Sequence, residues 1–322
     1  MQAIIHTRFG APGEVLRFGD TDGPALEPGG VLVRVRAAAV SKGDWLITQG
    51  LPFMARPMYG IRAPKQRVAG LEFSGVVEAA GPGADRFRPG DEVFGWGDGA
   101  MAEFVAVPAA QVAPKPEAVS FEQAAAAPVS GFAALQAVRD RGEVRAGGRV
   151  LVVGASGGVG SFAVQIAKAF GAEVTGVCST RNVDLVRSLG ADAVIDYRRE
   201  EITARGRRFD VILDIAGNRP LSVLRQALEP DGTLVVVGGS GGRWTMGFGR
   251  TVRATLLSPF VRQRLRPLIS KPNGADLAVL AELMESGRVT PLVGAGYPLR
   301  DAAEAVGLVG AGRSSGKTVV TP

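Results

Sequence analysis

The 322-residue sequence predicts an α/β protein with two domains, one β-rich and one built on a doubly wound parallel sheet. In the first third, short alternating strands are separated by clusters of Gly, Pro and Asp, which is typical of antiparallel β structure. After about residue 120, valine-rich strands alternate with amphipathic helical segments, which is typical of βαβ units. Residues 150–160, VLVVGASGGVG, end a buried apolar run in a glycine-rich turn.

The β-rich region begins with a clear period-two pattern. From Val31, the stretch VLVRVRA alternates apolar residues with arginine, so we expect a half-buried strand with Arg34 and Arg36 facing solvent. Further strands are predicted at residues 73–81, 91–96 and 103–108, each bounded by turn residues. Strands this short and closely spaced predict a small barrel-like antiparallel domain.

The second domain begins with a helix that Ser120 and Gln123 are spaced to cap as a capping box. Gly171 and Gly190 stand where helix C-terminal caps are expected. The alternating segments are GRVLVVG, VGSFAVQIAKAFG, AEVTGVC, DLVRSLG, DAVID, FDVILDIAG and TLVVVGG. Near the end, ADLAVLAELMESG predicts a helix and GKTVV a strand that returns to the first domain. We therefore place residues 1–123 and 270–322 in the β-rich domain and 124–269 in the parallel-sheet domain.

Composition narrows the classes of partner and compartment. The net charge of +6 comes from basic residues scattered along the chain, apart from 250–266, so we do not expect a nucleic-acid partner. The single cysteine, Cys178, excludes an intramolecular disulfide and fits a reducing compartment. The start lacks the pattern of a signal peptide, and no run of about 18 apolar residues predicts a membrane span. We expect a cytoplasmic protein.

The glycine turn predicts a dinucleotide site. A strand, the turn GASGGVG and a helix form the arrangement in which backbone amides at a helix N-terminus face a pyrophosphate. The spacing is GxxGxxG, one residue longer than the usual fingerprint, and the alternative is a purely structural strand–helix turn. The expected contacts are Gly154, Ser156, Gly157, Gly158, Val159 and Gly160.

The end of the next strand indicates which dinucleotide binds. NAD-binding proteins of this type carry a carboxylate about 20 residues past the glycines, where it binds the ribose hydroxyls. This chain has Ser179, Thr180 and Arg181 there, and hydroxyls with a guanidinium suit a 2′-phosphate. We therefore predict NADPH. The alternative is that Arg181 only begins a solvated helix, with Asp184 reaching back to it.

Metal and hydrolase chemistry lack the necessary residues. A catalytic zinc needs three ligands from Cys, His and carboxylates, and the chain has one histidine and one cysteine. We interpret His6 as a strand-face or surface residue and Cys178 as a small core residue. A Ser-His-Asp or Cys-His hydrolase is disfavoured by the same shortage. No metal site is predicted.

Several segments together resemble the medium-chain dehydrogenase/reductases, in the branch of zinc-lacking quinone oxidoreductases. The segments are GADRFRPGDEVFG, GAMAEFVAVP, FEQAAAAPVSGFAALQA, GASGGVGSFAVQIAKAFGAEV, SLGADAVIDY and LEPDGTLVVVGG. The resemblance runs from about residue 3 to 320. It implies a GroES-like catalytic domain made from both chain ends, a Rossmann domain between them, and commonly a homodimer.

The resemblance also implies roles for particular residues. Zinc-dependent relatives carry Cys and a His-Glu pair where this chain has Ser41, Leu71 and Glu72. Ser130 and the segment Gly238, Gly239 and Ser240 are expected to line the nicotinamide, and Tyr197 the 2′-phosphate. The usual tail GHxRGK reads GRSSGK here, which retains Lys317 as an expected cofactor contact and moves the arginine to Arg313.

Without a metal, hydride transfer from NADPH suits acceptors such as quinones or α,β-unsaturated carbonyls, because these accept it by their own electronics. The resemblance places Ser41, Asp44, Tyr59 and Lys65 near the cleft, with the first three as candidate catalytic residues. Tyr59 or solvent supplies the final proton. Each of the four is alternatively a surface or turn residue. The alternative functions are an enoyl-thioester or 2-alkenal reductase, and a non-catalytic NADPH-binding protein.

Residues 247–269 mix spaced arginines with Leu, Phe and Val at helical intervals. The apolar stripe predicts packing at a subunit interface or a lid over the substrate pocket. Attachment of a basic amphipathic helix to a membrane surface is the alternative.

Overall fold

The computed structural model of the chain describes residues 1–239 and 242–322. The chain divides into two compact units, Met1–Phe132 with Pro272–Pro322 (unit 1) and Ala133–Lys271 (unit 2). The boundaries expected from the sequence lay after residues 123 and 269. Helix α5 (Pro128–Leu135) contains the first boundary. Gly131 in this helix leaves room for Leu280 of unit 1, since a Cβ there would lie 2.7 Å from Leu280.

Unit 1 is built on a mainly antiparallel sheet in the order β14-β15-β3-β4-β5-β7, with β6 also paired to β3. Its main strands are β3 (Gly30–Val40), β4 (Glu72–Ala80), β5 (Glu92–Trp96), β6 (Phe104–Pro108), β7 (Val112–Pro114), β14 (Val293–Pro298) and β15 (Lys317–Thr321). A hairpin pairs β1 (Gln2–His6) with β2 (Leu16–Asp20). Its helices are α1 (Pro12–Val15), α2 (Lys42–Gln49), α3 (Arg56–Tyr59), α4 (Phe121–Ala125), α10 (Gly274–Glu285) and α11 (Ala302–Gly310).

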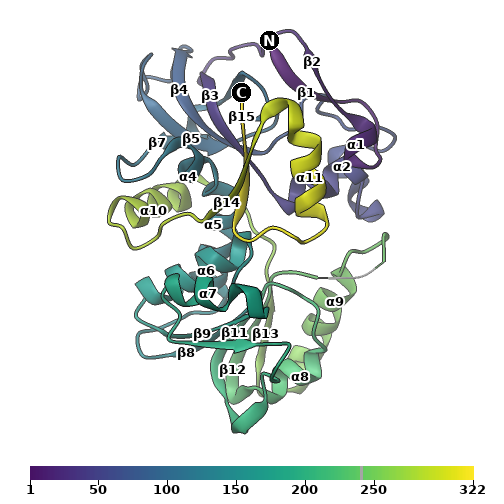
Figure 1. Cartoon of the computed structure of the whole chain (residues 1–322), viewed down its shortest axis with the longest axis vertical. Helices are drawn as coiled ribbons and strands as arrows, with labels where there is room; N and C mark the ends of the chain where they lie inside the picture. The colour runs from purple at the N-terminus through teal and green to yellow at the C-terminus, as the bar shows by residue number, and fades with distance from the viewer. Residues whose placement is uncertain (240–241) are drawn as a thin grey trace. The chain divides into compact units, whose positions relative to one another are not determined.

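The local predictions for unit 1 are confirmed. Along β3, Arg34 and Arg36 are exposed while the valines between them are buried in the core. Ser120 and Gln123 cap α4 reciprocally, as the capping box requires. The final strand β15 pairs with β3, so one sheet contains strands from early and late in the chain (Figure 1).

Unit 2 is a parallel sheet in the order β10-β9-β8-β11-β12-β13, the doubly wound order. The strands are β8 (Arg149–Val153), β9 (Glu173–Cys178), β10 (Ala193–Asp196), β11 (Phe209–Asp214), β12 (Leu228–Val236) and β13 (Arg264–Pro267). The helices are α6 (Gly158–Ala169), α7 (Val183–Ser188), α8 (Leu221–Gln226) and α9 (Phe248–Leu257). Central strands such as β8 are buried on both faces, which explains their continuous valine-rich sequence.

One expectation was wrong in part. The segment 247–269 is helical over α9 and the 3₁₀ turn Ser258–Phe260 that follows it, and residues 264–267 form the edge strand β13 beside β12. Arg264 and Arg266 therefore alternate with Leu265 on a strand, where only Leu265 is buried. Arg262, Arg264 and Arg266 alternate at the period of a strand, but this alternation is too short to outweigh the helical spacing of the residues before it.

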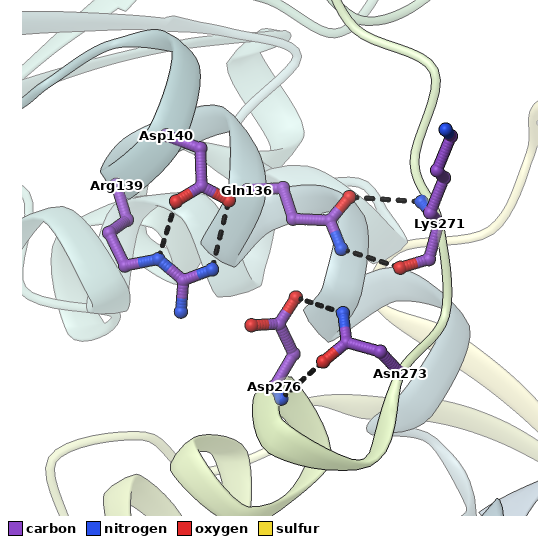
Figure 2. Close-up of polar contacts among 6 residues, drawn as sticks. All are labelled: Gln136, Arg139, Asp140, Lys271, Asn273 and Asp276. Carbon is purple, nitrogen blue, oxygen red and sulfur yellow. Dashed lines mark hydrogen bonds and ion pairs between the residues drawn. The ribbon is translucent and has the colours of Figure 1, made fainter.

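Unit 2 ends at Lys271 and the second segment of unit 1 begins at Pro272. On each side of this boundary a side-chain amide forms hydrogen bonds with the backbone (Figure 2). In unit 2, Gln136 donates from Nε2 to the carbonyl of Lys271 (2.8 Å) and accepts from its N–H (3.0 Å), which joins the first and last segments of the unit. In unit 1, the Asn273 side chain accepts from the N–H of Asp276 (2.8 Å) and caps α10.

Candidate active site

The glycine turn in unit 2 connects β8 to α6 with almost no side chains. Gly154 has φ +92°, which favours glycine, and its N–H donates to the carbonyl of Val177 on β9. A Cβ on Gly160 would lie 2.0 Å from the carbonyl oxygen of Gly154, so only glycine lets α6 approach the strand this closely. Gly157 is the N-cap, and a Cβ there would meet nothing nearer than 3.6 Å. The turn thus leaves an open backbone surface at a helix N-terminus.

The end of β9 carries the residues expected to select the dinucleotide. Ser179 is half-buried, and Thr180 and Arg181 are exposed in the short turn that follows. Asp184 pairs with Arg187 (3.1 Å) instead of reaching back to Arg181.

Two residues near this strand end were missed by the sequence analysis. Asn182 is buried and donates from Nδ2 to Oγ of Ser156 (2.9 Å), which ties the glycine turn to the end of β9. A hydrogen bond from Thr180, with nearby arginines, holds the pKa of Asp196 below its usual range. Asp196 stands opposite Cys178 in the next strand and pairs with Arg199 (3.4 Å), so a neutralised carboxylate borders the site. The sequence shows that Asp196 and Tyr197 end this strand, but nothing in it indicates that Asp196 accepts a hydrogen bond from Thr180.

Tyr197 follows β10 and is half exposed, with the guanidinium of Arg219 6.0 Å from its ring centroid. Its N–H donates to the carbonyl of Cys178, which places it directly beside the end of β9. Arg219 is therefore a further cation at this edge of the sheet that the sequence did not single out.

The loops after β11 and β12 cross at van der Waals distance. A Cβ on Gly238 would lie 1.9 Å from the carbonyl oxygen of Ile215, and one on Gly239 would lie 2.7 Å from Gly247. Ser240, the third residue expected here, lies outside the described residues. The close packing of these two loops therefore requires small residues at 238 and 239.

Below this crossing, Asp214 at the end of β11 is fully buried and paired with Arg250 of α9 (2.5 Å). Burial raises the pKa of Asp214, and Arg250 opposes the shift. The pair attaches α9 to the carboxyl edge of the sheet.

In unit 1, Ser41 caps α2 in a reciprocal box with Asp44. Both the N–H (2.7 Å) and the hydroxyl (2.6 Å) of Ser41 donate to Oδ2 of Asp44. Burial raises the pKa of Asp44, although the hydrogen bonds from Ser41 and the charge of Lys317 oppose the shift. The other oxygen, Oδ1, is buried and has no partner among the described residues.

Lys317 and Glu72 form a buried ion pair that joins β15 to β4. The second oxygen of Glu72 accepts from the N–H of Val129 (2.8 Å), beside the buried Ser130 in α5. Burial raises the pKa of Glu72 to about 7 in spite of Lys317. The nitrogen of Lys317, expected at the cofactor, is thus bound to a carboxylate.

A cavity of about 310 Å³ lies within unit 1. Its polar lining residues are His6, Asp44, Thr48, Tyr59, Lys65, Gln66 and Asp98. The remaining lining is largely apolar, including Ile47, Val68 and Leu71, which suits an organic ligand. The structure therefore brings two of the three candidate catalytic residues, Asp44 and Tyr59, into one cavity, with Ser41 behind Asp44.

The polar groups of this cavity differ in whether they already form hydrogen bonds with the protein. The hydroxyl of Tyr59 donates to the carbonyl of Leu51, and the ammonium of Lys65 to the carbonyls of Pro57 and Met58 (3.0 Å each). His6, interpreted from the sequence as a strand-face or surface residue, lies on the buried face of β1, and burial lowers its pKa. It faces inward because β1 places His6 on the same side as Ile4. Burial likewise raises the pKa of Cys178 to about 11, so the core interpretation of that residue holds.

Two family models match the chain. Residues 27–117 match the alcohol dehydrogenase GroES-like domain, and residues 189–320 match the zinc-binding dehydrogenase family. A chloroplast envelope quinone oxidoreductase homolog of Arabidopsis thaliana is 30% identical over 338 residues, which cover 100% of this chain and 98% of that protein.

Solved structures agree with this likeness. The quinone oxidoreductase from Coxiella burnetii is 28% identical with a TM-score of 0.85, over 100% of this chain and 99% of that one. A mycobacterial protein solved in complex with NADPH is 27% identical with a TM-score of 0.82, over 100% of both chains.

The strand order and the glycine turn define a dehydrogenase or reductase built on a Rossmann domain. With the full-length relatives, they show that the chain belongs to the medium-chain dehydrogenase/reductase superfamily, in its quinone oxidoreductase branch, and is an oxidoreductase. The resemblance stated from the sequence is confirmed, as is the combination of a GroES-like and a Rossmann domain. None of the described helices is both long and apolar enough to cross a membrane.

The zinc in the name of one matched family does not fit the residues present. The hydroxyl of Ser41 is bound to Asp44, Leu71 has no donor atom, and Glu72 is held by Lys317. Over residues 1–239 and 242–322, no group of three or more His, Cys, Asp and Glu side chains gathers as a metal site would require. We derive no step through zinc.

Proposed function

We propose that the chain is a zinc-independent, NADPH-dependent reductase that transfers hydride to a quinone or an α,β-unsaturated carbonyl compound. The observation that carries the proposal is the glycine turn between β8 and α6, because its close packing and open backbone suit a pyrophosphate and little else. A homodimer and a cytoplasmic location are part of the proposal.

The preference for NADPH rests on the residues after β9. Ser179, Thr180 and Arg181 replace the carboxylate that would bind ribose hydroxyls, and Arg219 lies against Tyr197 nearby. Asp196 is an opposing charge beside them, but it pairs with Arg199 and accepts a hydrogen bond from Thr180. A 2′-phosphate at this edge would gain charge-assisted hydrogen bonds from the exposed arginine.

Bound NADPH would supply the hydride, and the residues of the unit 1 cavity would bind the acceptor. In an enone, hydride adds to the β-carbon, the electron pair moves to the carbonyl oxygen, and a proton adds to the α-carbon. Because Tyr59 donates to Leu51 and Ser41 to Asp44, the carboxyl of Asp44 is the candidate of the three with an unpartnered oxygen. Burial raises the pKa of Asp44, so its carboxyl takes up a proton more readily than an exposed one would.

A panel of acceptors tests this function. Benzoquinone, naphthoquinone, an enone, a 2-alkenal and an enoyl-CoA are each mixed with enzyme and NADPH, and loss of the reduced cofactor's absorbance is followed. We expect turnover of quinones or enones that a zinc chelator leaves unchanged. Turnover confined to the enoyl-CoA or the 2-alkenal, which are also α,β-unsaturated carbonyl compounds, would restrict the substrate to that of the alternative reductase and exclude quinones and enones. Binding of NADPH without any turnover would leave a non-catalytic binding protein.

Arg181 provides the test of cofactor choice. Arg181→Ala should raise the Kd for NADPH about 10-fold or more, since a hydrogen bond to a charged group contributes about 1.5–3 kcal/mol, and should leave NADH binding nearly unchanged. Calorimetric titration with each cofactor measures both. The matched control is Arg187→Ala, an exposed arginine in α7 that pairs with Asp184. Equal losses for the two cofactors would refute the 2′-phosphate assignment.

A further inference from the structure

The cavity of unit 1 offers a ligand few free polar atoms. Five of its seven polar lining residues already form side-chain hydrogen bonds within the unit: Thr48, Tyr59, Lys65, Gln66 and Asp98. The other two each keep one buried atom without a partner among the described residues, Nε2 of His6 and Oδ1 of Asp44. In a largely apolar cavity, a small number of such polar groups fixes the orientation of a ligand.

The surroundings of His6 determine which kind of group its free nitrogen can bind. The side chain is 2% exposed, and burial lowers its pKa, so the imidazole is neutral at pH 7. Hydrogen bonds with the backbone of Thr48 and Arg8 oppose the shift, as bonds to carbonyl oxygens do. The proton of the neutral ring is therefore held on Nδ1, toward the backbone, and Nε2 is left as an acceptor. An acceptor atom requires a donor, such as a hydroxyl group, on the ligand.

The second free atom belongs to Asp44, the residue proposed above to act on the reacting carbonyl compound. Asp44 and Thr48 are four residues apart on α2, so they lie on one side of the helix about 5.4 Å apart, which is one turn. Because His6 bonds to the backbone of Thr48, the two free atoms are also separated by about one turn along α2. A six-membered ring with oxygen atoms on opposite carbons spans such a separation.

We propose, on the basis of the proposed function, that His6 binds a hydroxyl group of the acceptor, and that the preferred acceptor is a cyclic enone with this hydroxyl across the ring from its carbonyl. The hydroxyl donates to Nε2 of His6, while the carbonyl lies at Asp44. An acceptor without the hydroxyl leaves Nε2 buried and unpaired, and a site of this kind discriminates against such analogues. His6 is thus a specificity-determining residue.

Three saturated ketones test the binding step apart from catalysis. Cyclohexanone, 4-hydroxycyclohexanone and 4-methoxycyclohexanone are titrated into the full chain without cofactor, and binding is followed by ligand-observed NMR. The hydroxy ketone should bind with a Kd about fivefold or more below that of either of the others, because only its hydroxyl can donate to Nε2. Equal Kd values for the three ketones, or no binding of the hydroxy ketone, would overturn the inference.

Substitutions then assign the effect to His6. His6→Leu removes the accepting nitrogen and should reduce the difference between the hydroxy and methoxy ketones to less than about twofold, whereas His6→Gln retains an accepting oxygen and should keep part of it. The matched control is Gln66→Leu, which removes a polar group of the same cavity that already bonds to Asp98 and should keep the whole difference. Circular dichroism checks that each variant is folded. A full difference in His6→Leu would place the hydroxyl elsewhere and refute the assignment.

Turnover separates this inference from the proposed function. With NADPH, kcat/KM should be at least about fivefold higher for 4-hydroxycyclohex-2-enone than for cyclohex-2-enone or 4-methoxycyclohex-2-enone. Equal values for the three enones would contradict the role of His6 and leave the reductase function standing. If none of the enones is consumed although the hydroxy ketone binds as expected, the reductase function fails and the hydroxyl site is supported.

Discussion

Gly160 has no space for a side chain, whereas Gly157, three residues earlier, has open space. Both belong to the same glycine pattern in the sequence. Gly160 allows close helix–strand packing, whereas Gly157 leaves a backbone surface free. The sequence could predict that glycines were needed in this turn. It could not assign the reason for each, because that depends on how closely α6 approaches β8.

Substitutions at the two glycines should separate stability from binding. Gly160→Ala should lower the free energy of unfolding by about 2 kcal/mol or more, because its Cβ would overlap the carbonyl of Gly154. Gly157→Ala should change it by less than about 1 kcal/mol yet weaken NADPH binding at least about tenfold, because the methyl group occupies the open surface. Urea denaturation and calorimetric titration measure the two effects. Normal NADPH binding by Gly157→Ala would place the pyrophosphate elsewhere.

His6 illustrates what residue-level reasoning misses. A lone histidine in a strand gives no sign of its surroundings, and its burial follows from the register of β1 with β2 and from the cavity formed by distant segments. Asn182 and Arg219 were missed for the same reason, since their partners Ser156 and Tyr197 are 26 and 22 positions away in the sequence.

At the scale of elements, the strands β3 to β6 and β15 of unit 1, the strands β8 to β12 of unit 2 and the helices α4, α6, α7 and α10 were predictable, because period-two alternation, valine-rich runs and caps are local signals. Helix α9 was predicted too long, since β13 joins the sheet through pairing with β12 that no local pattern encodes. The attachment of α9 by Arg250 was also unpredictable, because its partner Asp214 lies 36 residues away.

The Arg250–Asp214 pair yields a prediction for α9. Arg250→Met should lower the free energy of unfolding by about 3–5 kcal/mol, because it leaves the carboxylate of Asp214 buried without a partner. The deficit should shrink as the pH is lowered from 8 to 5, since protonation relieves a carboxyl whose pKa is already raised. Arg253→Met, exposed on the same helix, should change stability by no more than about 0.5 kcal/mol. Equal urea midpoints for the two variants would show that the pair contributes nothing.

At the scale of the whole molecule, the resemblance identified the two-domain architecture and the family, and the order of motifs along the chain carried that information. The strand–turn–helix geometry of the proposed dinucleotide turn could be predicted, because its residues are contiguous. The site could be predicted less well for unit 1, where Asp44, Glu72 and Lys317 come from segments far apart in the sequence and meet only in the folded sheet.

The Glu72–Lys317 pair predicts how stability depends on pH. Folding raises the pKa of Glu72 from about 4.5 to about 7, so the native state holds this proton when the unfolded chain has lost it. Stability from this group is therefore present below pH 4.5 and is lost as the pH rises toward 7. Urea midpoints of the wild type should fall over this range, and those of Glu72→Gln should fall less steeply, because the amide does not titrate.

The control for this pair is Glu78→Gln on the same strand, which removes an exposed partner of Arg34 and should keep the wild-type slope. Parallel slopes for all three proteins would mean that Glu72 does not titrate between pH 4.5 and 7.

The position of β15 between β14 and β3 has a consequence during synthesis on the ribosome. Unit 2 is one uninterrupted stretch and can fold as soon as Lys271 has emerged, whereas the strand that completes the sheet of unit 1 is translated about 180 residues after Phe132. Until then β3 has an unpaired edge at residues 38–40, where β15 later pairs, and this edge could pair with another nascent chain. Ribosome pausing or stop codons shortly before residue 317 should therefore promote aggregation, although nearly the whole polypeptide has been made.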